Sequence, residues 1–199
     1  MKTLKQLREM AKSIGNSSFS GLEHYGKEGR KKNFNSTKDM DVHTHLTNML
    51  KLHHRPDSYR THYFTNDHAA GETLHKSTIT KLKSQSYSVP FDHEVQHDVD
   101  RVKSNDVLPK GHATTVTYNH FKKSKFPLVS SGQQFRKGHE MWHRLVHKAL
   151  DDKHHVYHWD GNKLHPTTKE NAEDHLHKSF GVDDSFLHKH MIISKKKLD

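Results

Sequence analysis

The sequence contains no cysteine, and hydrophobic residues make up only 30% of its 199 positions. The lack of cysteine excludes disulfide frameworks, thiolate nucleophiles and cysteine-type zinc sites, and it fits a reducing compartment. No apolar run approaches the ~18 residues that a membrane span needs. The first residues, MKTLKQLREMAKSIG, lack the apolar core of a secretory signal. These absences predict a protein that does not use a membrane.

Basic residues and histidine are abundant instead. The formal net charge is +10 with histidine neutral, and 23 histidines would each add a positive charge on protonation. The excess of lysine and arginine lies in residues 1–60 and 111–199, while residues 61–110 are close to neutral. A basic protein favours polyanions such as nucleic acid, although a basic surface also simply keeps a protein in solution.

The N-terminal region is typical of an arm. Residues 13–38 are rich in Gly, Ser, Asn and Lys and end on a basic run, so they cannot bury much surface. Such an arm either stays solvated or becomes ordered against a partner. We therefore expect a basic N-terminal helix and arm region over residues 1–54, with short helices at 2–13 and 40–52, and one domain over residues 55–199.

The expected domain is of the α/β class. The last third shows the clearest alternation of strand and helix patterns, with turn signals between them. From the whole domain we expect a mixed sheet flanked by helices. The segments expected as strands are 59–64, 112–118, 126–129, 154–159 and 191–193. Those expected as helices are 92–103, 138–150 and one that starts at a capping box, Thr167 to Glu170, and ends near Gly181.

Four stretches of residues 126–194 carry a resemblance: PLVSSGQQFRKGHEMWHRL, HHVYHWDG, KENAEDHLHKSFG and HKHMIIS. They resemble the second half of GNAT-type acyltransferases, and more closely GNAT-like proteins of tailed bacteriophages. In that family a strand ends in a Gln/Arg-x-x-Gly-x-Gly/Ala loop, whose amides hold the coenzyme A pyrophosphate where the next helix starts. The resemblance implies acetyl-CoA contacts from Arg136, Lys137, Gly138 and His139. By spacing from the matching glycine, it implies His177 as the general acid.

The same loop departs from the family pattern. Phe135 replaces its polar first residue, and Glu140 brings a carboxylate where a small residue belongs, which would repel a pyrophosphate. The leading hypothesis is therefore a degenerate GNAT-like fold without cofactor. It would act as a structural or internal virion protein, made in the bacterial host cytoplasm and part of an oligomeric assembly with other virion proteins or packaged DNA. The alternative is an active acyl-CoA-dependent N-acyltransferase.

A third hypothesis comes from the histidines. His139, His143 and His147 recur every fourth residue on one expected helix, so they form a row that could share Zn²⁺ in a metal-dependent hydrolase. Because histidine makes up about 12% of the chain, chance alone would produce about as many such spacings as the sequence contains. The other interpretation of the row is a polar face that becomes charged at low pH.

Lysines alternate with aromatic residues between Tyr118 and Phe126. Such interleaving is typical of nucleic-acid binding, although Phe121 and Phe126 would also serve as core residues that anchor a basic loop. In either case Lys122, Lys123 and Lys125 are the side chains expected to contact phosphate.

Overall fold

The structure is a computed structural model, and the residues it describes are 35, 42–45, 50–56, 58–101, 108–131, 136–181 and 184–199. The fold is mixed α/β, as predicted. The chain forms two compact units. The first comprises residues 1–55, 63–77 and 98–106, and the second comprises residues 56–62, 78–97 and 107–199. The expected boundary after residue 54 lies at the end of the first of these segments.

In the first unit, the helix expected over residues 40–52 is wrong. Strand β1 (Val42–His45) pairs antiparallel with β2 (Leu50–Pro56), with His45 opposite Lys51. Several residues here are β-branched or histidine, which suit a strand as well as a helix. The helix expected at residues 2–13 and the arm expected at 13–38, except for residue 35, lie outside the described residues.

The strand expected at residues 59–64 is confirmed as part of β3 (Arg60–Asp67), which is followed by β4 (Glu72–Leu82). The turn between them is fixed by Asp67, whose Oδ1 accepts the amides of Ala69 at 2.9 Å and Ala70 at 3.1 Å. Buried Thr73 donates its hydroxyl to Asn66 Oδ1 at 2.8 Å. A short Asx turn and a satisfied polar pair thus close this hairpin.

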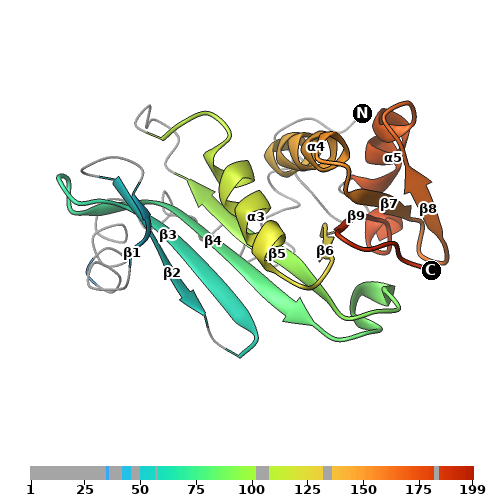
Figure 1. Ribbon diagram of the computed structural model, residues 1–199, viewed down its shortest axis with the longest axis horizontal. Helices are drawn as coiled ribbons and strands as arrows, with labels where there is room; N and C mark the ends of the chain where they lie inside the picture. The colour runs from blue at the N-terminus through green and yellow to red at the C-terminus, as the bar shows by residue number, and fades with distance from the viewer. Residues whose placement is uncertain are drawn as a thin grey trace. The chain divides into compact units, whose positions relative to one another are not determined.

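The second unit contains the sheet that positions the candidate site (Figure 1). Its strands follow the order β5 (His93–Arg101), β6 (Leu128–Val129), β9 (His190–Ser194), β7 (His155–Trp159) and β8 (Leu164–Thr167). β5 and β6 are parallel, whereas β9 is antiparallel to both β6 and β7. β6 and β7 therefore run in the same direction with β9 inserted between them. The strands expected at 126–129, 154–159 and 191–193 are confirmed.

Two expectations are wrong between β4 and β6. Residues 92–103 were expected to form a helix but contain β5, and residues 112–118 were expected to form a strand but begin α3 (His112–Lys123). In β5, His93 and Val95 alternate with polar neighbours, and His93 is buried like an apolar residue. Because β5 and β6 are parallel, a crossover must join them, and the β-branched segment is placed in that helix.

The two C-terminal helices are α4 (Arg136–Asp151) and α5 (Ala172–Ser179). α4 confirms the helix expected at residues 138–150. The expected capping box is wrong, since Thr167 is the last residue of β8 and Asn171 is the N-cap of α5. The Oδ1 atom of Asn171 accepts the amide of Thr168 at 2.7 Å, which rigidifies this entry to the helix.

Gly181 has a different role from the expected helix cap. α5 ends at Ser179, and Phe180 follows in extended conformation, with φ −128°. A Cβ placed on Gly181 would lie 2.2 Å from two ring carbons of Phe186. The position therefore excludes a side chain because an aromatic ring packs directly on its backbone.

The core of the second unit lies between α4 and the sheet. Trp142, Leu145, Val146 and Ala149 are buried on one face of α4, as the sequence predicts, and every residue of β9 is buried. In the described part of the chain, no helix has the length and apolarity required to cross a bilayer.

Candidate metal centre

α4 has a second face, away from the core. His143 and His147 lie on it one turn apart, with 44% and 36% of their side chains exposed. α5 packs beside α4 and carries Glu173 in its first turn (Figure 1). Spacing of four residues on one helix, with a partner from a second helix, gathers these three side chains at the helix–helix seam.

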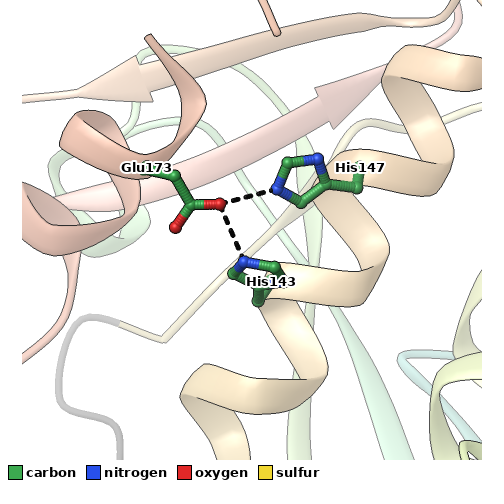
Figure 2. Close-up of side chains that lie close together, drawn as sticks. All are labelled: His143, His147 and Glu173. Carbon is green, nitrogen blue, oxygen red and sulfur yellow. Dashed lines mark hydrogen bonds and ion pairs between the residues drawn. The ribbon is translucent and has the colours of Figure 1, made fainter. Parts of the chain in front are cut away.

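One carboxylate oxygen connects both rings, as Figure 2 shows. Glu173 Oε1 accepts from His143 Nε2 at 2.8 Å and from His147 Nε2 at 2.9 Å. The two ring centroids are 4.5 Å apart. The three potential ligand atoms all lie within 4.8 Å of one another, so a single ion could reach all three with small side-chain rotations.

The electrostatics keep the carboxylate available as a ligand. The hydrogen bond from His147 is the largest influence on Glu173, and with the contribution of His143 it lowers the pKa of that carboxyl. Glu173 is 58% exposed, so water reaches the cluster from outside. An ionised carboxylate with two imidazoles is a donor set that Zn²⁺ accepts, with positions left over for water or another ligand.

The structure separates His139 from the other two members of the predicted row. Its ring lies beside His177, at 6.0 Å between centroids, and Phe180, at 5.3 Å. Its Nε2 is buried and has no hydrogen-bond partner, and burial is the main cause of its lowered pKa. His139 lies one helical turn before His143 on α4. The three potential ligands are therefore His143, His147 and Glu173.

The other residues predicted from the family resemblance lie near one another. Arg136, Lys137 and Gly138 form the first turn of α4, rather than a loop before it, and His177 is exposed on α5. The ring contact between His139 and His177 joins the predicted cofactor loop to the predicted acid.

The predicted phosphate-contacting lysines are also exposed. Lys122 and Lys123 are the last two residues of α3, and Lys125 follows shortly after. The neighbouring rings of Tyr118 and Phe121 are buried, at 1% and 0% exposure. The interpretation of Phe121 as a core anchor is therefore confirmed.

Two features were missed from the sequence. Glu173 lies on a different helix from its histidines, so no local spacing indicates it. The other is the Gly-x-Ala sequence Gly111-His112-Ala113 at the start of α3. Gly111 is the N-cap residue of that helix, with φ 81°.

Comparison with known proteins found no matching family model, no matching curated protein and no matching solved structure. The geometry of the described residues therefore carries the functional argument.

Proposed function

We propose that this protein binds a divalent transition-metal ion, Zn²⁺ in the first instance, through His143, His147 and Glu173. The observation that carries the proposal is the single oxygen of Glu173 within 2.9 Å of both Nε2 atoms. Imidazole nitrogen and carboxylate oxygen are ordinary zinc ligands, and Ni²⁺ and Cu²⁺ accept the same donors. The proposal retains two members of the predicted histidine row and replaces His139 with Glu173.

Three protein ligands leave room for an exchangeable one. Open zinc sites of this kind hold a water as the fourth ligand, and a bound ion makes that water more acidic. The hydrolase hypothesis depends on this open position. The exposure of the cluster supports an accessible ion, because solvent and small molecules reach Glu173 directly.

The test is zinc binding by titration calorimetry, with metal analysis after dialysis. We expect one tight equivalent for the wild type and a loss of about 100-fold or more in affinity for His147→Ala or Glu173→Gln, because even outer-shell changes cost 10–100-fold. His139→Ala should change the affinity less than about threefold, since the His139 ring packs beside His177 and Phe180 and makes no hydrogen bond to a ligand.

The matched control is His165→Ala. His165 also forms an exposed histidine–carboxylate pair, with Asp160 at 2.6 Å, but the described residues add no third ligand there. With 23 histidines in the chain, weak binding at many sites must be distinguished from one built site. The proposal is wrong if His165→Ala weakens binding as much as His147→Ala, or if the wild type retains no zinc.

A second candidate function is supported by the order of the strands. We propose a GNAT-like fold for the second unit, with acyl-CoA as its ligand. Two observations support it: the parallel pair of β5 and β6 joined by the crossover helix α3, and the Gly111-x-Ala113 pattern at the start of α3. Helix N-termini after such a turn are suited to pyrophosphate. In this proposal the pyrophosphate site lies at the start of α3 rather than at residues 136–139.

Mutations distinguish the two candidate pyrophosphate sites, at the start of α3 and at residues 136–139. If the site at the start of α3 binds acetyl-CoA, the ligand should raise the melting temperature of the wild type. Ala113→Glu should abolish this rise through charge repulsion, while the double variant Arg136→Gln/Lys137→Gln should retain it. The reverse pattern would assign the cofactor to α4. No shift of the wild type at millimolar acetyl-CoA would reject the acyltransferase.

A role as a virion protein, within an oligomeric assembly and near packaged DNA, remains a prediction from the family resemblance and the basic charge. It is compatible with metal binding, since an exposed ion is also available to a partner chain.

A further inference from the structure

Two basic runs that are distant in the sequence meet in the second unit. Leu128 pairs with Ile193 in the antiparallel register of β6 and β9, so the chain leaves β9 beside the chain that enters β6. The ammonium of Lys195 donates to the carbonyl oxygens of Lys122, at 3.2 Å, and Ser124. These contacts hold the C-terminal lysines against the end of α3.

The exposed lysines of the two runs form a positively charged patch. We define the basic patch as Lys122, Lys123, Lys125, Lys196 and Lys197, all of which are exposed. No acidic residue occurs within residues 122–126 or 194–198, and Asp199 follows the second run. Lys195 is excluded from the patch because its ammonium satisfies the last carbonyls of the helix, which is a structural task.

The positive charges of the two segments act on the same neighbouring side chain. His154 lies close by, and after burial, the largest cause, both Lys195 and Lys122 lower its pKa. Asp152 has the opposite effect and raises the pKa of His154. Its carboxylate also accepts a hydrogen bond from the hydroxyl of Tyr118 at 2.7 Å and pairs with Lys148 at 3.7 Å. Asp152 therefore offsets only part of the positive charge, through its interaction with Lys122.

The aromatic residues of this region are not available to stack on bases. Tyr118 and Phe121 are buried, and the ring of Phe126 is covered by the ammonium of Lys81 at 4.1 Å from its centroid. Binding of single strands depends largely on exposed aromatic platforms, whereas contact with a duplex backbone needs only suitably spaced cations. Lysines on flexible stems act as point charges toward phosphate.

We propose that the basic patch binds the phosphate backbone of double-stranded nucleic acid, without reading its sequence. The inference is independent of the metal centre and of acyl-CoA. It extends the three lysines that the sequence indicates to a site built from two segments. It favours duplex over single strand because Tyr118 and Phe121 are buried and Lys81 covers the ring of Phe126.

The test is fluorescence anisotropy of a labelled 24-base-pair DNA duplex between 50 and 200 mM salt, with the full chain. Five phosphate contacts predict a slope of log affinity against log salt of about −4.5, near −0.9 for each contact. Lys122→Gln/Lys123→Gln/Lys125→Gln should make the slope shallower by about 2.7, and Lys196→Gln/Lys197→Gln by about 1.8. The single-stranded form of the same sequence should bind more weakly.

A control triple keeps the net charge change equal. Lys163→Gln/Lys169→Gln/Lys178→Gln removes three exposed lysines, of which Lys169 and Lys178 are paired with Asp151 and Asp174. Equal weakening by the control and patch triples would show that only net charge matters and would overturn the proposal. So would tighter binding of the single strand. The proposal would also be overturned if the patch variants lose binding to phosphatidylserine vesicles but not to the duplex. That result would assign the patch to a membrane surface.

Discussion

Lowering the pH from 8 to 5 should reduce the free energy of unfolding by about 4 kcal/mol, mainly through two buried histidines. His158 is 5% exposed and His190 is fully buried. The pKa of each is lowered to about 4, with burial as the largest cause. Total stability for a domain is typically about 5–15 kcal/mol, so this loss is a substantial share of it.

The sign follows from proton binding. In the unfolded chain a histidine takes up a proton below pH ~6.5, whereas in the folded chain these two resist protonation until pH ~4. Between these values the unfolded state binds more protons, so stability falls as the pH falls. At pH 5 each site contributes about 2 kcal/mol of this loss relative to pH 8.

His158 has a specific reason to stay neutral. Ser179 donates its hydroxyl to the carbonyl of His175, so its oxygen must accept from Nδ1 of His158, at 2.7 Å. The ring also lies 5.2 Å from that of His175 and 5.9 Å from that of His165. A proton added to His158 would therefore be buried beside two further imidazoles, against which Asp160 gives partial compensation.

His190 is a less simple case. Its two ring nitrogens lie near the carbonyl oxygens of Ser130, at 2.8 Å, and Tyr87, at 3.2 Å. A neutral ring donates to one of them, while a protonated ring would donate to both. Burial outweighs this gain and keeps the pKa low. We therefore expect His158 to be the clearer reporter of the acid effect.

Urea unfolding at pH 8, 6.5 and 5 measures the effect. His158→Gln should lose about 2 kcal/mol of the pH dependence, because glutamine cannot titrate, even though the variant is less stable at pH 8. His155→Gln, an exposed position on the same strand, should retain the wild-type dependence. If His158→Gln and His190→Gln both show the full wild-type decrease, other groups cause the acid sensitivity.

The sequence predicted the C-terminal third well because its signals are local. The apolar stripe of α4 through Trp142 and Leu145 and the short strand ending at Trp159 each follow from periodicity. Local signals misled where histidine or β-branched residues were buried. His93 occupies a core position that a hydrophobicity pattern does not count, and the Thr-rich start of α3 is helical because a parallel pair requires a crossover.

The metal centre was half predictable for the same reason. His143 and His147 share a helix, so their spacing shows that they are neighbours. Glu173 joins them only because α5 packs on α4, which depends on the whole sheet order. Nothing in the spacing distinguishes His139, which turns toward Phe180, from its two successors.

Truncation of Trp142 tests how the fold presents that centre. Trp142 is 1% exposed and is the largest fully buried side chain in the described part of the chain, on the core face of α4 next to the face that carries the site. Trp142→Ala should reduce the free energy of unfolding by about 3–5 kcal/mol, through lost burial and a residual cavity. Arg144→Ala, exposed on the same helix, should change it by less than about 0.5 kcal/mol.

Zinc affinity of the same variants separates packing from ligation. The core face and the ligand face of α4 are distinct, so any Trp142→Ala protein that remains folded at low temperature should bind zinc within about threefold of wild type, because Trp142 neither ligates the ion nor hydrogen-bonds a ligand. If it does not fold, Trp142→Phe keeps an aromatic ring against Phe180, 6.5 Å away, and serves the same purpose. Zinc should then stabilise wild type and Trp142→Phe by equal amounts but leave His147→Ala unchanged, because only a ligand for the folded state shifts its stability. A zinc response that disappears with Trp142→Phe but persists with His147→Ala would mean that the ion binds elsewhere in the chain.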